Sequence, residues 1–141
     1  MKISDLKLPE PFRQQYGKFD KLTPIQEKSV DAGLLEGRSL LACAPTASGK
    51  TLVATMAIYN IVGKGKAIYL VPLKALGSEK FKEYLKSFQG SPYKVGLSTG
   101  DIDSESDYLS NYDILILTTE KLDSLLRHRT PWLSEVKVVI V

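Results

Sequence analysis

A chain of 141 residues with 43% hydrophobic and 25% charged residues has the composition of one globular domain with its own core. Its 19 basic and 16 acidic residues leave a net charge of +3, too small to identify a nucleic-acid binder by charge alone. The single cysteine excludes an internal disulfide, no apolar run approaches the roughly 18 residues of a membrane span, and no signal peptide is visible, so a cytoplasmic protein without membrane attachment is expected.

The N-terminal part of the chain predicts two helices. Pro9 to Tyr16 have the length of a short helix that stops at Gly17, and residues 1–20 are expected to form a lead-in ahead of the main domain, residues 21–141. The second helix is predicted to run from Pro24 through Leu35 and to end at Gly37.

The start of the second helix contains a residue with two possible roles. Thr23 is a natural N-cap, Pro24 suits the first helical position, and Gln26 follows the cap by three residues. This is the spacing of a capping box, so the residues alone favour a Gln26 side chain that closes its own helix end.

Residues 39–51, S-L-L-A-C-A-P-T-A-S-G-K-T, predict a strand, a loop and a helix that together bind phosphate. The apolar run 40–44 is expected to be a strand with Cys43 buried in the core, and a helix is expected to open at residues 49–51 and to run through Ile61. Backbone N–H groups at such a helix start cradle phosphate, Lys50 would reach the β/γ-phosphates, and the Thr51 hydroxyl would ligate Mg²⁺. The expected nucleotide-binding loop comprises Ala44 (where the usual pattern has glycine), Pro45, Thr46, Ala47, Ser48, Gly49, Lys50 and Thr51.

Strands and helices alternate along the rest of the chain. Apolar runs predict strands at 67–71, 95–97, 113–118 and 136–141, the last as an inner strand, and helical spacing predicts helices at 76–88 and 119–127. This order predicts an α/β fold of three layers, a parallel sheet with helices on both faces. The loops after residues 43, 71, 98 and 118 are expected to share one rim at the carboxyl ends of the strands, where ligands bind.

Two charged segments have simple interpretations. Acidic residues alternate over 101–107, but an EF-hand loop needs Gly and Glu where this chain has Ser106 and Tyr112, so a solvated loop is expected. The basic cluster Arg127, His128 and Arg129 is interpreted as a solvated helix end.

An ordered set of motifs resembles a known family. Thr23-Pro24-x-Gln26 precedes A-P-T-A-S-G-K-T, and V-P-L-K-A-L (71–76), T-G-D (99–101) and T-T-E-K-L-D-S-L-L-R (118–127) follow in order. This set resembles the first RecA-like motor domain, a P-loop NTPase fold, of superfamily 2 helicases in the ski-type DExH branch. Within that branch, the run T-E-K-L-D-S-L-L-R-H-R-T-P-W-L is most similar to archaeal DNA repair helicases that act at stalled forks.

The resemblance implies ATP with Mg²⁺ as the bound nucleotide and gives Gln26 the role of reading adenine, which a side-chain amide can pair with at N6 and N7. It also implies an ATP-driven 3′-to-5′ motor on single-stranded or forked DNA, with RNA as a possible track, and a second RecA-like domain as partner. Contacts to the strand backbone are implied for Pro72, Leu73, Lys74, Ala75, Gly100, Thr118, Thr119 and Lys121.

The family continues its last strand into Asp-Glu-x-His, the Walker B motif, whereas this sequence stops at Val141. The chain is therefore expected to be a fragment, truncated before the Walker B motif and inactive by itself. Three alternatives stay open: a ski-type RNA helicase motor, a P-loop kinase of a small molecule, for which no Arg-rich lid is visible, and a nucleotide-gated interaction module.

Overall fold

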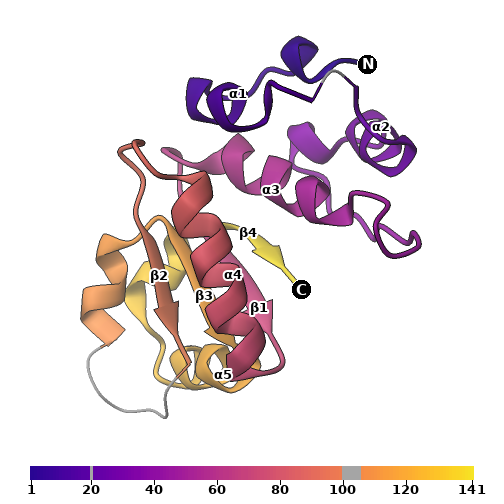
Figure 1. The fold of residues 1–141 in the computed structure, drawn as a ribbon. Helices are drawn as coiled ribbons and strands as arrows, with labels where there is room; N and C mark the ends of the chain where they lie inside the picture. The colour runs from indigo at the N-terminus through magenta and orange to yellow at the C-terminus, as the bar shows by residue number, and fades with distance from the viewer. Residues whose placement is uncertain (20, 100–105) are drawn as a thin grey trace. The chain divides into compact units, whose positions relative to one another are not determined.

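Four strands of the described residues form one parallel sheet in the order β2-β3-β1-β4. The structure is a computed structural model that describes residues 1–19, 21–99 and 106–141 (Figure 1). The chain divides into two units, Met1–Asn60 and Ile61–Val141, and each is described by itself.

The sheet belongs to the second unit, and its strands are β1 (Lys66–Val71), β2 (Val95–Ser98), β3 (Ile114–Thr118) and β4 (Val136–Ile140). The apolar runs that predicted them are therefore confirmed as strands. All five residues of β3 are buried, because this strand has a neighbour on each side and a covered surface on each face. Its register places Thr118 opposite Val71 of β1 and Leu117 opposite Ser98 of β2, so three of the expected loops leave one edge of the sheet.

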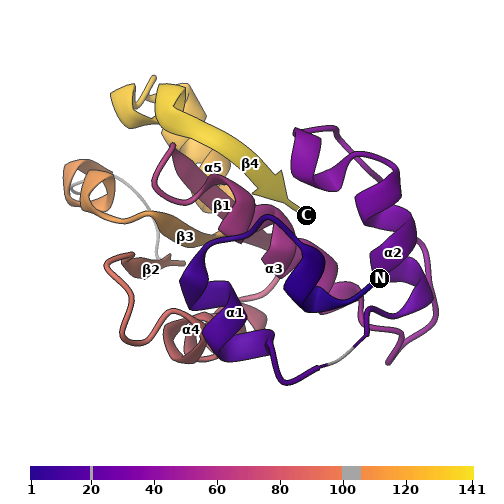
Figure 2. The ribbon, with the colours of Figure 1, turned by 90° about the horizontal axis from the view of Figure 1, so that it is seen from above.

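Two helices cover opposite faces of this sheet, and Figure 2 shows the strands between them. On one face α4 (Lys74–Ser87) packs against β1, β2 and β3, with the tilted rings of Tyr84 and Tyr69 5.7 Å apart. On the other face, α5 (Thr119–Arg127) packs with the 3₁₀ segments η3 (Ser106–Asn111) and η4 (Pro131–Glu135). The core on that face consists of Ile68, Leu109, Leu115, Leu117, Leu125 and Trp132. The predicted three-layer α/β arrangement is confirmed for this unit.

The last strand differs from its prediction. Among the described residues β4 pairs with β1 alone, and its side chains alternate between half-buried and exposed, with Val139 45% exposed. An apolar run cannot distinguish an inner strand from an edge strand, because that depends on whether a second neighbour pairs with it. The inner-strand prediction for residues 136–141 is wrong in this structure.

The first unit is helical. It contains η1 (Ile3–Asp5), α1 (Glu10–Tyr16), α2 (Pro24–Asp31), η2 (Leu34–Glu36) and α3 (Lys50–Ile61). The last residue of α3, Ile61, already belongs to the second unit. The ring of Phe12, a fully buried residue, lies 5.3 Å from the ring of Tyr59 and 5.0 Å from that of Tyr16, which ties α1 to α3. The predicted helices at 9–16 and 50–61 are confirmed.

The second predicted helix is shorter than expected. It starts at Pro24 as predicted but ends at Asp31, and the chain turns through Gly33, whose φ is +103°, into the 3₁₀ turn that Gly37 closes. The apolar spacing continues through this break because the 3₁₀ turn packs against α2 and buries Leu34. Gly33 was the missed stop signal, since its left-handed conformation cannot continue an α-helix.

The run 40–44 has no regular secondary structure and pairs with no strand among the described residues, which corrects the prediction of a strand there. Leu41 is 90% exposed, and Cys43 is exposed rather than buried in a core. A strand needs a neighbour to satisfy its backbone N–H and C=O groups, and the sheet of the second unit is built from other segments.

Two predictions fall on segments without a description. Gly100 and the acidic residues at 101–105 lie outside the described residues.

No helix in the described part of the chain has the length and apolar character to cross a membrane.

Candidate nucleotide site and nucleic-acid interface

The predicted phosphate loop lies in the first unit and opens directly into α3. Residues 46–49 form a turn, and Lys50 and Thr51 are the first two residues of this 12-residue helix. Both side chains are exposed. The first N–H groups of a helix have no acceptor within the helix, so this end presents backbone donors and the positive end of the helix dipole to an anion.

The loop contains one internal hydrogen bond and one residue with strained backbone. Ser48 Oγ donates a hydrogen bond to the carbonyl oxygen of Pro45 at 2.5 Å. Ala47 has φ +65°, the left-handed conformation that a side chain with Cβ disfavours by about 1–2 kcal/mol. Strain of this kind concentrates where the surrounding structure requires a particular backbone, and here it falls inside the predicted phosphate loop.

Gln26 joins the start of α2 to this loop. Its Oε1 accepts a hydrogen bond from the N–H of Thr23 at 2.9 Å, which is the capping contact expected from the sequence. Its Nε2 donates to the carbonyl oxygen of Gly49 at 3.0 Å, 23 positions along the chain. Gln26 therefore caps its own helix and contacts the phosphate loop through different atoms of one amide.

Gly49 has a packing reason to be glycine. Its φ is +90°, and a Cβ built on it would lie 2.4 Å from Gln26 Nε2 and 3.0 Å from Thr23 Oγ1. The Thr23 hydroxyl has the capping-box position at the start of α2. Its oxygen is buried there and makes no hydrogen bond. The sequence indicated only the approach of a phosphate at this glycine, whereas the structure shows that α2 also occupies the space.

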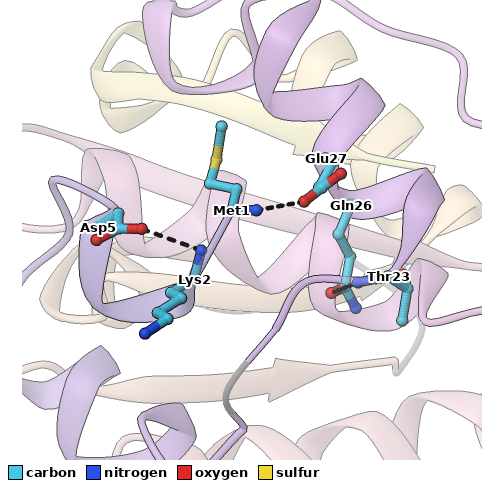
Figure 3. A network of polar contacts seen from close by, with 6 residues as sticks. All are labelled: Met1, Lys2, Asp5, Thr23, Gln26 and Glu27. Carbon is cyan, nitrogen blue, oxygen red and sulfur yellow. Dashed lines mark hydrogen bonds and ion pairs between the residues drawn. The ribbon is translucent and has the colours of Figure 1, made fainter.

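The N-terminal lead-in supports the same turn of α2. The amino group of Met1 pairs with Glu27 Oε1 at 2.5 Å (Figure 3). The carbonyl oxygen of Met1 also accepts a hydrogen bond from the N–H of Leu22 at 3.2 Å. Lys2 N–H is bound in turn by Asp5 Oδ2 at 3.1 Å. The two contacts of Met1 could not be predicted from the sequence, because they join the first residue to Leu22 and Glu27 through its terminal amine and its carbonyl oxygen.

The predicted nucleic-acid contacts lie in the second unit, at the carboxyl edge of its sheet. We call the segments 72–75 and 118–121 the carboxyl rim. They follow β1 and β3 directly, and the pairing of Val71 with Thr118 places them side by side. Residues 72–75 are all exposed, and they lead into the first turn of α4.

The rim residues differ in their exposure. Thr118 is 4% exposed, and its Oγ1 accepts a hydrogen bond from the N–H of Lys121 at 3.3 Å, which caps α5. Lys121 is itself only 7% exposed, whereas Lys74 and Thr119 are exposed. The exposed polar side chains of the proposed contacts are therefore those of Lys74 and Thr119, together with backbone N–H groups at the starts of α4 and α5.

Gly77 was not singled out from the sequence, yet it lets α4 approach this edge closely. A Cβ on Gly77 would lie 3.2 Å from Thr99 and 3.3 Å from both Leu97 and Val71. Its only sequence signal is its position inside a predicted helix, where glycine is otherwise unfavourable.

No cluster of three or more His, Cys, Asp or Glu side chains suited to a metal ion is found in the part of the chain that the structure describes. The metal ligand predicted from the motif, the Thr51 hydroxyl, is at an exposed position next to Lys50.

A parallel sheet with a helix layer on each face and a Gly-Lys-Thr loop that opens a helix define an α/β nucleotide-binding domain of the RecA-like class. A model of the family described as DEAD/DEAH box helicase matches residues 23–141. The chain belongs to the DEAD/DEAH box helicase family, and the resemblance inferred from the motifs is confirmed.

The curated relatives include two archaeal proteins named ATP-dependent DNA helicase Hel308. That of Pyrococcus horikoshii is 47% identical over 145 residues, which cover 100% of this chain and 20% of the relative. That of Methanocella arvoryzae is 47% identical over 148 residues, which cover 99% of this chain and 20% of the relative. The chain thus spans about a fifth of the length of these relatives.

Among solved structures, the DUF1998 helicase MrfA bound to DNA matches this chain with a TM-score of 0.81 at 24% identity. The match covers 95% of this chain and 21% of that chain. At this identity the likeness establishes the fold.

Proposed function

We propose that this chain is the ATP-binding part of the motor of an ATP-dependent DNA helicase. The observation that carries the proposal is the hydrogen bond between Gln26 Nε2 and the Gly49 carbonyl oxygen, 3.0 Å apart. It brings the residue expected to read adenine to the loop expected to hold phosphate. The printed names of the relatives, ATP-dependent DNA helicase Hel308, support the same assignment.

The loop fits a Mg²⁺-nucleotide. Lys50 and Thr51 are exposed at the start of α3, and the left-handed backbone at Ala47 and Gly49 turns the loop around that helix end. Lys50 would neutralise phosphate charge, and the Thr51 hydroxyl would hold Mg²⁺, which supplies further neutralisation of the phosphates when bound. Gln26 would select adenine through the second lone pair of Oε1 and the second N–H of Nε2, which the contacts with Thr23 and Gly49 do not use.

The carboxyl rim is the proposed track for a single strand. Lys74 supplies a positive charge, Thr119 a hydroxyl, and the starts of α4 and α5 supply backbone N–H groups. Such contacts bind phosphates and read no base sequence. By the family resemblance we further propose 3′-to-5′ movement on single-stranded or forked DNA in repair and replication restart, with a second RecA-like domain that completes the ATP site.

Calorimetry with Mg²⁺-ADP and Mg²⁺-ATP tests the nucleotide site. Lys50→Ala removes a charge-assisted contact worth about 1.5–3 kcal/mol, so the affinity should fall roughly ten- to a hundredfold. Lys7→Ala is the matched control, because Lys7 is an exposed lysine of the same unit outside the loop. Equal affinities of the wild-type and Lys50→Ala proteins would reject the site.

A further inference from the structure

The two polar ends of the Gln26 amide are both used inside the protein. Oε1 accepts from the Thr23 N–H, Nε2 donates to the Gly49 carbonyl oxygen, and the residue is only 4% exposed (Figure 3 shows the first contact). A helix cap needs the oxygen alone, since the group to be satisfied is the Thr23 N–H. The bond from Nε2 to Gly49 is therefore not explained by capping.

The contact with Gly49 requires glycine at that position. A Cβ built on Gly49 would lie 2.4 Å from the amide nitrogen of Gln26, which is too close for any side chain. The Gly49 carbonyl oxygen also accepts the N–H of Leu52 at 3.2 Å, so two donors fix its direction. One donor comes from α2 and the other from the first turn of α3.

A fixed Gly49 carbonyl also fixes the direction of a backbone N–H that can donate a hydrogen bond to a phosphate. The peptide unit that links Gly49 to Lys50 is planar and trans, so its C=O and its N–H point in opposite directions. With the oxygen held on Gln26 and Leu52, the N–H of Lys50 is turned away from α2. That N–H is one of the helix-start donors on which the proposed phosphate binding depends.

We propose that Gln26 is a positioning residue for the phosphate loop, in addition to its base-reading role: it holds the Gly49 carbonyl and thereby aims the Lys50 N–H at the phosphates. This inference rests on the proposed nucleotide binding. It predicts that Gln26 contributes to the affinity for phosphate compounds that contain no adenine, which a base reader alone would not do.

The test replaces Gln26 by methionine, which keeps the length of the side chain, removes both polar atoms and adds no charge. Binding of Mg²⁺-ATP, Mg²⁺-GTP and Mg²⁺-tripolyphosphate to the full chain is measured by calorimetry. We expect Gln26→Met to weaken all three ligands, with tripolyphosphate and GTP reduced about three- to tenfold by the loss of the one hydrogen bond. Gln14→Met, at an exposed position of α1, is the matched control and should change none of them.

A ligand-free measurement supplies a second readout. ¹⁵N relaxation should show greater motion at the amides of Gly49, Lys50 and Thr51 in Gln26→Met than in the wild type. Gln26→Glu separates capping from positioning, because its carboxylate still accepts the Thr23 N–H but donates nothing to Gly49. Its buried carboxylate faces the Gly49 carbonyl oxygen, so the three loop amides should become at least as mobile as in Gln26→Met, and the melting temperature should fall because a charge is buried.

Three results decide the outcome. If Gln26→Met weakens ATP alone and leaves the loop amides unchanged, Gln26 only reads the base and the proposal is overturned. If the loop amides of Gln26→Glu behave as in the wild type, the cap and not the bond to Gly49 holds the loop, which also overturns it. If the wild type binds no nucleotide at all, the proposed function fails, and the relaxation data still decide whether Gln26 holds the loop.

Discussion

Lys66 donates a hydrogen bond to the carbonyl oxygen of Tyr112, with 2.6 Å between Nζ and O. The same ammonium donates to the carbonyl oxygen of Ser110 at 2.6 Å and lies 5.9 Å from the centre of the Trp132 ring. Lys66 is only 6% exposed, so one buried lysine joins the first residue of β1 to the end of η3 and to η4. This contact holds together three segments of the second unit.

Lys66→Met should therefore destabilise the protein. The substitution leaves two carbonyl oxygens without their donor, and an unsatisfied buried group costs about 1–3 kcal/mol. Urea unfolding measures the change, with Lys64→Met as the control, because Lys64 is exposed two positions away. A Lys66→Met protein as stable as the control would mean that the cost of burying the ammonium equals the value of its hydrogen bonds.

The proposed selection of adenine is assigned to Gln26. Gln26→Ala should narrow the preference for ATP over GTP by roughly tenfold, since a bidentate amide–adenine pair discriminates by about 1–3 kcal/mol. Competition binding with the two nucleotides gives the ratio, and Gln14→Ala at an exposed site of α1 controls for the substitution itself. An unchanged ratio together with a lower melting temperature would assign Gln26 to capping alone.

The carboxyl rim should bind a single strand weakly and with strong salt dependence. Lys74→Ala removes one phosphate contact, so the slope of log K against log salt should become shallower by about 0.7 for an oligonucleotide without secondary structure. Lys94→Ala is the matched control, because this exposed lysine precedes β2 at the opposite edge of the same sheet. Equal losses in the two variants, or NMR shift changes confined to the edge at Lys94, would contradict the assignment.

Two residues after the end of α5, the backbone is strained at Arg129, whose φ is +51°. Arg129→Gly should stabilise the protein by about 0.5–1 kcal/mol, because glycine adopts this conformation without the penalty of a Cβ, less its own entropic cost. Arg127→Gly should instead destabilise it, since Arg127 is helical and pairs with Asp123 at 3.1 Å. Thermal unfolding of both variants checks the opposite signs, and a loss of stability on Arg129→Gly would show that the arginine side chain outweighs the strain.

The sequence predicted the parts of the fold that local chemistry determines. The apolar run of β3 and the capping pattern at Thr23 both appear where expected, because burial on two faces and a helix N-terminus each require particular residue types nearby. It failed at residues 40–44 and 136–141, where the state of a segment depends on which other segment pairs with it. No local pattern contains that information.

The candidate site shows the same division. The loop with Lys50 and Thr51 was identifiable because phosphate binding at a helix start needs glycine, lysine and a hydroxyl in fixed order. The bond from Gln26 to Gly49 was not, because it joins positions 23 residues apart through a carbonyl group that every residue has. The burial of Lys121 could not be predicted for a related reason, because the motif specifies the residue type and not the residues that surround it.

The ladders on both sides of β3 have a mechanical consequence for a motor. Thr119 follows directly from Thr118, the last residue of a strand that is hydrogen-bonded to β1 along one side and to β2 along the other. A strand of nucleic acid that pulls on the rim at Thr119 would load both ladders in shear, so that many hydrogen bonds share the force at once. The rim would therefore transmit the load to the whole sheet without yielding at its point of attachment.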